Sequence, residues 1–184
     1  HVDVKVMAPM VATADEAAWF ARRVATAGLS TAGVMIETPA AALRARDVLA
    51  EVDFGSLGTN DLAQYAMAVD RTQGALSELL DPWQPGVLTC VAAACEGTLE
   101  AGKPLGVCGE SAGDPLMALV LVGLGVTSLS MAPGLLPAVR ASLAVHTLEE
   151  CRAIAAAALA ARTAADAREA ALALARPEVA ILSD

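Results

Sequence analysis

Short apolar runs alternate along the chain with longer segments in which apolar residues recur at helical spacing. Short runs bounded by glycine, proline or acidic residues are typical of buried strands, and the longer segments are typical of amphipathic helices. The pattern predicts five strands, at residues 4–8, 33–37, 52–57, 104–108 and 126–131. It predicts helices at 13–27, from Pro39 through Leu49, at 61–68, 86–101, 115–124 and 133–144, from 147 onward, and at 163–177.

Several of these helices carry recognisable start signals. A Thr-x-x-Glu sequence predicts a capping box, in which each side chain bonds the other residue's backbone amide. An Asp-Pro pair predicts an N-cap followed by the first helical residue. These signals occur at Thr13/Glu16, Thr147/Glu150 and Asp114/Pro115.

Strands that alternate with helices imply an α/β fold with a parallel sheet. Polar and glycine-rich residues follow each predicted strand, on the side where a (β/α) barrel places its chemistry. A complete barrel of this kind has eight strands, and this chain provides about five β/α units. We therefore expect residues 1–184 to form a single domain, the C-terminal part of a (β/α)8 TIM barrel.

The composition is 56% hydrophobic, and Pro115 to Val139 has no charge and is long enough to span a bilayer. Glycines, prolines and hydroxyl residues interrupt this stretch, so a buried helix, a turn and a strand are favoured over a membrane span. The net charge of −9 argues against nucleic acid as a partner. The four cysteines form no CxxC pair and no signal peptide is visible, which favours a reduced, cytoplasmic setting.

Two carboxylates follow successive predicted strands. Because parallel strands end at the same edge of a sheet, Glu37 and Asp61 are expected to converge and could hold Mg²⁺ together with substrate oxygens. Capping of the following helix is the alternative role for Asp61. Asn60 stands at the same helix start, where backbone N–H groups favour phosphate, or it is simply a turn residue.

Two further residues could take part in chemistry at this edge. Arg71 could grip a phosphate with two parallel hydrogen bonds, or it could form a surface ion pair with Asp70. Cys108 ends a strand, and its thiol could act as a proton donor or could be a small buried apolar group. His146, just before a helix start, is expected to face solvent.

Several ordered motifs together resemble enzyme I of the bacterial sugar phosphotransferase system. They are GVMIETPAAA at 33–42, EVDF at 51–54, GTNDL with QY at 58–65, AVDR at 68–71, GVCGE with AGDP at 106–115, and SLSM at 128–131. The resemblance spans roughly residues 3 to 175. It implies a barrel that binds phosphoenolpyruvate (PEP) and Mg²⁺, with Glu37 and Asp61 as metal ligands. It further implies that Asn60 contacts the phosphate, Arg71 clamps its oxygens, and Cys108 protonates the enolate as pyruvate forms.

The resemblance also implies partners that this sequence does not contain. In that family the phosphoryl group moves to a histidine on a separate N-terminal domain, and from there to the histidine phosphocarrier protein. Met7 to Met10 is similar to the family's fourth strand, so three strands and further active-site arginines are expected to be missing. We therefore expect this chain alone to be inactive in transfer to a protein, and we expect a homodimer.

Three other interpretations remain open. Pyruvate phosphate dikinase and PEP synthase share the barrel and the GTNDL-like segment, although the AVDR and CGE motifs favour enzyme I. A metal-dependent 2-keto acid aldolase has similar strands but would not need Cys108 or Arg71. A non-catalytic dimerisation or ligand-sensing module is the third possibility.

Overall fold

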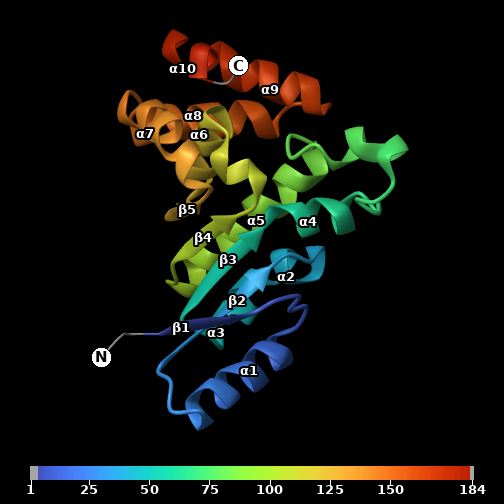
Figure 1. The fold of residues 1–184 in the computed structure, drawn as a ribbon, viewed down its shortest axis with the longest axis vertical. Coiled ribbons are helices and arrows are strands. Elements are labelled where there is room, and N and C mark those ends of the chain that lie inside the picture. The colour runs from blue at the N-terminus through green and yellow to red at the C-terminus, as the bar shows by residue number, and fades with distance from the viewer. Residues whose placement is uncertain (1–3, 183–184) are drawn as a thin grey trace.

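A five-stranded, wholly parallel sheet forms the centre of the computed structural model, which describes residues 4–182 (Figure 1). The strands pair in chain order, which confirms the predicted α/β fold with one strand in each expected region. They are β1 (Lys5–Ala8), β2 (Thr31–Ile36), β3 (Phe54–Gly58), β4 (Leu105–Cys108) and β5 (Ser128–Ser130).

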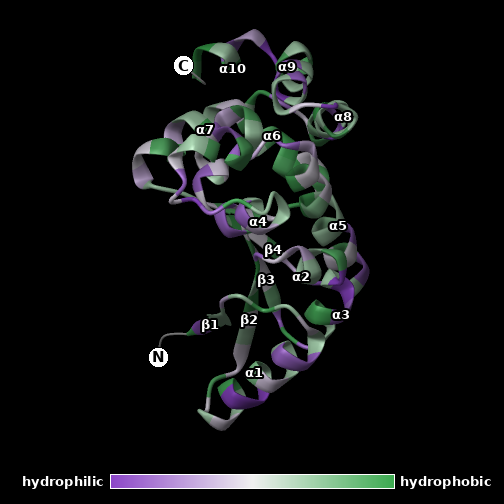
Figure 2. Cartoon of the chain, turned by 90° about the vertical axis from the view of Figure 1, so that its right-hand side faces the viewer, coloured by the Kyte–Doolittle hydropathy of each residue, from purple (hydrophilic) through white to green (hydrophobic). Residues whose placement is uncertain are grey.

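Helices cover one face of this sheet. Figure 2 shows α2 (Pro39–Leu43), α3 (Ala45–Ala50) and α5 (Pro85–Ala101) on the same side of the middle strands, and the described part of the chain places no helix on the other side of these strands. Strand residues that face the helices are large and fully buried, such as Ile36 and Leu57. Because side chains alternate along a strand, the residues between them face the open side. This open face carries mostly small or flexible side chains, at Met7, Gly33, Met35, Ser56, Gly58, Gly106, Cys108, Ser128 and Ser130.

The predicted helix starts are confirmed. α1 (Ala14–Thr26) and α8 (Leu148–Leu159) both begin with complete capping boxes, at Thr13/Glu16 and Thr147/Glu150. The Asp114 carboxylate accepts from the backbone amides of Leu116 and Met117 at the start of α6 (Pro115–Leu124). α4 (Thr59–Ala66) and α9 (Ala164–Leu174) also lie where helices were expected.

The structure differs from the predicted pattern in two places. The helix expected from Pro39 through Leu49 is interrupted at Arg44, and the backbone there lies against α5 at Gly97, where a Cβ atom would stand 2.6 Å from the Arg46 amide nitrogen. The last helix was expected to reach residue 177, but α9 ends at Leu174 and Pro177 begins a further helix, α10 (Pro177–Leu182). Short 3-10 turns that the pattern did not indicate are η1 (Gly74–Leu80) and η2 (Glu110–Gly113). The helix expected at 133–144 begins as a 3-10 turn, η3 (Pro133–Leu135), and continues as α7 (Leu136–Ala144).

The long uncharged stretch is divided as expected. It forms α6, β5, η3 and the beginning of α7, and α6 is buried on almost all sides beneath α7 and α8. Within residues 4–182, no helix combines the length and the hydropathy that crossing a bilayer requires. One continuous set of buried side chains runs from Val11 to Val179.

His146 was expected to face solvent, but in the structure its ring is half-buried. Its Nδ1 lies 2.8 Å from the carbonyl oxygen of Ser142, and its Nε2 accepts from the backbone amide of Arg176 at 3.0 Å. The half-buried ring therefore joins the end of α7 to the turn between α9 and α10.

Candidate functional site

Three neighbouring strands end at one level of the sheet. Ile36 pairs with Leu57 and Gly58 pairs with Cys108, so Glu37 and Cys108 lie on either side of Gly58 at the carboxyl edge. Asn60 and Asp61 follow Gly58 directly in the first turn of α4. The structure therefore places these predicted site residues along one edge, as the parallel order of the strands requires.

Glu37 is held by two features of the backbone around it. Its Oε1 accepts from the Met10 amide at 2.7 Å, and Met10 has the left-handed backbone conformation, with φ of 56°. Its Oε2 lies over Gly58, where a Cβ atom would stand only 2.4 Å away. The side chain is 3% exposed, and no hydrogen bond engages Oε2 within residues 4–182. Gly58 therefore leaves the space that one carboxylate oxygen of Glu37 occupies.

Asp61 and Arg71 complete the charged part of this edge. Arg71 Nη2 lies 3.1 Å from Asp61 Oδ1. Burial raises the pKa of Glu37, the Met10 amide opposes this, the Asp61 carboxylate raises the pKa further, and Arg71 lowers it. Asp61 and Arg71 are thus near enough to Glu37 to act on its charge. The alternative pairing of Arg71 with Asp70 is wrong, because the Asp70 carboxylate accepts from the Thr72 amide and hydroxyl instead.

Asn60 stands where the beginning of α4 meets the turn after β4. Its Oδ1 accepts from the Glu110 amide at 3.3 Å, and no side chain caps the N–H groups of α4. Gly109 permits this approach: with φ of 123°, it would place a Cβ atom 2.5 Å from Thr59 Oγ1. Asn60 lines two hollows, of about 410 Å³ toward Ser130 and Met131 and about 240 Å³ toward Leu80 and Pro82. Free N–H groups beside a hollow can receive an anion.

The Cys108 thiol lies on the open face of the sheet and is half-buried. Ser56 Oγ donates to its sulfur at 3.2 Å, and the thiol donates to the Leu57 carbonyl at 3.4 Å. Cys95 provides the contrast, since burial within α5 raises its pKa to about 12. Cys108 therefore has the polar neighbours and the access that proton transfer requires, whereas Cys95 is a core thiol.

Sequence reasoning missed three contributors to this site. The Met10 amide, the Ser56 hydroxyl and the space above Gly58 all act through contacts between segments far apart in the chain. Small residues in the FGSLG strand are a signal for close approach, and they could have identified Ser56 and Gly58. The left-handed backbone at Met10 has no comparable signal in the sequence.

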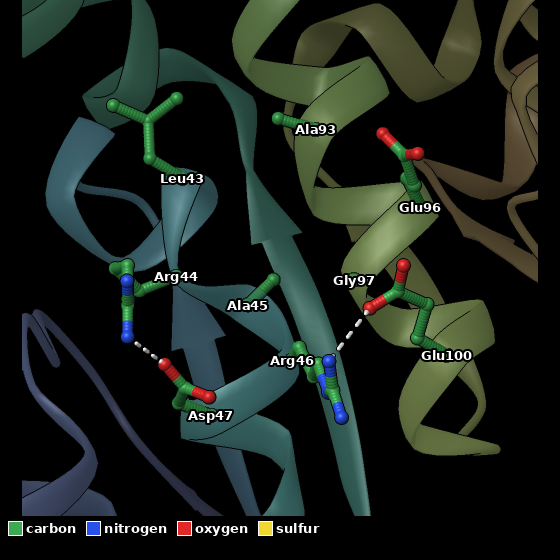
Figure 3. A pocket seen from close by; sticks show the side chains of 9 residues that line it. All are labelled: Leu43, Arg44, Ala45, Arg46, Asp47, Ala93, Glu96, Gly97 and Glu100. Carbon is green, nitrogen blue, oxygen red and sulfur yellow. Dashed lines mark hydrogen bonds and ion pairs between the residues drawn. The ribbon is translucent and has the colours of Figure 1, made fainter.

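A larger hollow lies away from this edge. It measures about 420 Å³ and is formed by the outer surfaces of α2, α3 and α5 (Figure 3). Four of its five charged side chains pair with one another, Arg44 with Asp47 and Arg46 with Glu100, and the fifth is Glu96. No cluster of three or more His, Cys, Asp or Glu side chains that could hold a metal occurs in residues 4–182. Glu37 and Asp61 could hold Mg²⁺ as a pair, since this ion commonly binds one or two carboxylates plus phosphate oxygens and water.

Comparison with known proteins identifies the family of this chain. Residues 1–148 match the PEP-binding domain of PEP-utilising enzymes. The phosphoenolpyruvate-protein phosphotransferase of Streptomyces coelicolor is 58% identical over 174 residues, which cover 94% of this chain and 31% of that protein. Its counterpart in Geobacillus stearothermophilus is 40% identical over 161 residues, 80% of this chain and 28% of that protein. A multiphosphoryl transfer protein of Xanthomonas campestris is 45% identical over 137 residues, 74% of this chain and 16% of its own length. This chain thus spans less than a third of each of these relatives, and it belongs to the PEP-binding domain family of PEP-utilising enzymes.

Proposed function

We propose that this chain is the PEP- and Mg²⁺-binding part of a phosphoenolpyruvate-protein phosphotransferase, the enzyme that begins sugar phosphotransfer and releases pyruvate. The observation that carries the proposal is the position of the buried Glu37 carboxylate and the Asp61 carboxylate at one edge of the sheet, where Arg71 pairs with Asp61 and Cys108 also lies. Such a pair is short of positive charge. A site of this kind favours a cation, and phosphoryl transfer depends chiefly on charge neutralisation and alignment.

Glu37 and Asp61 would be the metal ligands. Glu37 offers Oε2, because Oε1 is occupied by the Met10 amide, and Asp61 offers Oδ2, because Oδ1 is paired with Arg71. Bound Mg²⁺ would neutralise negative charge on the phosphate and carboxylate oxygens of PEP. The two carboxylates hold their positions without it through Met10, Gly58 and Arg71.

Asn60 and Arg71 would bind the phosphate. The uncapped N–H groups at the start of α4 supply dipoles for an anion, and the Asn60 side chain borders the same hollow. The Arg71 guanidinium is 57% exposed and uses one nitrogen for Asp61, so donors remain for phosphate oxygens.

Cys108 would protonate the methylene carbon of the enolate that remains when the phosphoryl group leaves. Its thiol lies on the open face of the sheet, on the strand next to Gly58, and Gly58 leads into the helix that carries Asp61. A metal-dependent aldolase would leave Cys108 and Arg71 without a role, so the phosphotransferase is the better account of the site.

The remaining participants belong to the part of the relatives that this chain does not span. We place the phosphorylated histidine on an N-terminal domain of the same enzyme, with the histidine phosphocarrier protein as the next acceptor. We also propose a homodimer acting in the cytoplasm. The three half-buried or buried thiols on helices, at Cys90, Cys95 and Cys151, are unpaired and suit a reducing compartment.

The test joins this chain to the upstream part of the Streptomyces coelicolor relative and measures PEP binding by calorimetry. We expect binding that needs Mg²⁺, is lost with EDTA, and weakens at least about tenfold in Arg71→Ala, the loss expected for one charge-assisted contact. Arg44→Ala is the matched control, because Arg44 is also cationic and exposed but pairs with Asp47 at the hollow formed by α2, α3 and α5. Equal affinity of the parent protein and Arg71→Ala would contradict the proposed phosphate site.

A further inference from the structure

Two buried hydroxyl groups meet at the carboxyl edge of the sheet. Thr59 is the first residue of α4, and Ser111 belongs to the η2 turn that follows β4. Their side-chain oxygens lie 2.7 Å apart, and the two residues are only 3% and 4% exposed. Thr59 Oγ1 also donates to the Cys108 carbonyl oxygen at 3.4 Å, which leaves Ser111 as the donor between the two hydroxyls. Hydrogen bonds therefore run from η2 through the start of α4 to the end of β4.

Two neighbouring features join the same two segments. The Asn60 side chain accepts from the Glu110 amide at 3.3 Å. Gly109 leaves the space that the threonine fills, since a Cβ atom there would stand 2.5 Å from Thr59 Oγ1. In the described part of the chain, the Ser111 hydroxyl has no hydrogen bond besides the one to Thr59. We call this Thr59–Ser111 contact the hydroxyl bridge, and at 2.7 Å it is shorter than the bond that Asn60 accepts.

The hydroxyl bridge connects two groups of proposed substrate contacts. The metal and phosphate contacts lie between the end of β2 and the turn after α4, at Glu37, Asn60, Asp61 and Arg71. The proposed proton donor, Cys108, lies across the bridge at the end of β4. PEP carries its phosphate and its methylene carbon in one small molecule, so both groups of contacts must fit it at once. Productive geometry of this kind has to be held to within about 0.5 Å.

A hydrogen bond keeps the two segments closer together than apolar contact would. Oxygen atoms joined by an O–H···O bond stand about 2.7 Å apart, whereas carbon atoms in contact stand about 3.5–4.0 Å apart. An apolar pair in place of Thr59 and Ser111 would therefore separate the segments by roughly 1 Å more. A hollow of about 240 Å³ borders both residues, so the structure has space for this movement.

We propose that Thr59 and Ser111 are positioning residues whose hydroxyl bridge sets the distance between the phosphate contacts and the Cys108 thiol, an inference that rests on the proposed function. Neither hydroxyl is left to touch the substrate, because they bond to each other and to the Cys108 carbonyl. Loss of the bridge therefore slows proton delivery to the enolate carbon and leaves PEP binding almost intact.

The first test measures amide hydrogen exchange at Glu110 in this chain by NMR. The double variant Thr59→Val/Ser111→Ala should exchange this amide about three- to tenfold faster than the parent, because the turn moves away from the Asn60 side chain that accepts from it. Thr98→Val is the matched control, since it removes a threonine hydroxyl that is also 3% exposed but bonds to the Ala94 carbonyl within α5. Equal exchange in the parent and the double variant would overturn the inference.

The second test uses the protein joined to its upstream part, and compares PEP affinity with the rate of pyruvate release in a single turnover. The double variant removes both polar partners, so it leaves no buried hydroxyl unpaired and should remain folded. We expect Mg²⁺-dependent PEP affinity within about threefold of the parent, and pyruvate release slower by about 10–100-fold, the loss that a displacement near 1 Å can cause. Thr59→Ser keeps the hydroxyl and should restore release to within about threefold of the parent. An equal loss of affinity and rate would overturn the inference.

The configuration of the new methyl group gives an independent measure of positioning. PEP with deuterium and tritium at defined positions of its methylene group should give pyruvate of one configuration in the parent, because one thiol supplies the proton. The double variant should give a mixture, because water then protonates the enolate on either face, and a single configuration would overturn the inference. If the parent protein neither binds PEP nor releases pyruvate, the proposed function itself fails. Parent-like release in the double variant removes only the role of the hydroxyl bridge.

Discussion

Glu37 at the carboxyl edge of the sheet and Glu150 in the C-terminal helices are two glutamates with opposite surroundings. Glu150 accepts from the Thr147 amide at 2.6 Å and from Arg176 Nη2 at 2.8 Å. The Thr147 backbone bond, the Thr147 hydroxyl and Arg176 together lower the pKa of Glu150 to about 2. Burial raises the pKa of Glu37 and the Asp61 carboxylate raises it further, against the lowering by the Met10 amide and by Arg71. Glu150 thus has an ion pair with Arg176, whereas within residues 4–182 Glu37 has no direct ion pair, since Arg71 pairs with Asp61.

Gly58 and Gly123 show a similar difference between the sheet edge and the C-terminal helices, in the atoms that surround each glycine. Gly58 at the edge meets the side chain of Glu37, where an added Cβ atom would stand 2.4 Å from Oε2 and 2.9 Å from Cβ. Gly123 in α6 meets the backbone of α8, where a Cβ atom would stand 2.1 Å from the Cys151 carbonyl oxygen. One glycine makes room for a functional group, and the other allows two helices to pack closely.

Substitution of the two glutamates is expected to give the largest difference in PEP binding between the sheet edge and the C-terminal helices. Glu37→Gln keeps the shape of the side chain but removes the negative charge that a metal requires. Mg²⁺-dependent PEP binding should fall by about 100-fold or more, because even changes around a metal's ligands cost roughly 10–100-fold. Calorimetry of the joined protein, with and without Mg²⁺, measures this loss.

Glu150→Gln is the matched control for that experiment. It makes the same chemical change in the helical region and should leave PEP affinity within about twofold of the parent. An equal loss of binding in both variants would mean that Glu37 acts through general stability, and the contrast between the two regions would fail.

The two glycines give the next largest effect. Gly123→Ala should lower the free energy of unfolding by roughly 1–3 kcal/mol, because backbone cannot yield to the added methyl group. Gly58→Ala should change unfolding less but weaken Mg²⁺-dependent PEP binding about tenfold, because it displaces a proposed ligand. Urea unfolding and calorimetry on both variants measure the two quantities, and a larger binding loss in Gly123→Ala would reverse the assignment.

The sequence predicted local signals well and distant contacts poorly. It predicted all five strands and the meeting of Glu37 and Asp61, because the parallel order alone brings successive strand ends together. It left two roles open for Arg71, a phosphate contact and an ion pair with Asp70. It did not indicate the pairing of Arg71 with Asp61, which the structure shows while the Asp70 carboxylate accepts from Thr72.

The same limit applies in the helical region. The capping box at Thr147 and Glu150 was visible in the sequence because its partners are three residues apart. Arg176 contacts Glu150 and His146, which lie 26 and 30 residues before it in the sequence. Helical or strand periodicity does not predict contacts over such separations. Met10 at the edge belongs to the same class, since its amide reaches Glu37 across 27 residues.

The smallest expected effect is the response of the two glutamates to acid. The pKa of Glu150 is lowered in the folded chain, so its contribution to stability is present above about pH 4.5 and is lost as pH falls toward 2. The pKa of Glu37 is raised, so its contribution is most favourable below about pH 4.5 and declines as pH rises through the raised value. Chemical unfolding of this chain from pH 2 to 7, without Mg²⁺, measures both.

Glu150→Gln should therefore be less stable than the parent at pH 7, with the difference disappearing near pH 2. Glu37→Gln should be at least as stable as the parent at pH 7, with no difference below about pH 4.5, because the parent carboxyl is then neutral as well. Glu149→Gln, on the adjacent position of α8, controls for the loss of one surface charge. If both Glu37→Gln and Glu150→Gln lose stability at neutral pH, then Glu37 already has sufficient positive partners within the chain, and the argument for a bound cation at this edge is wrong.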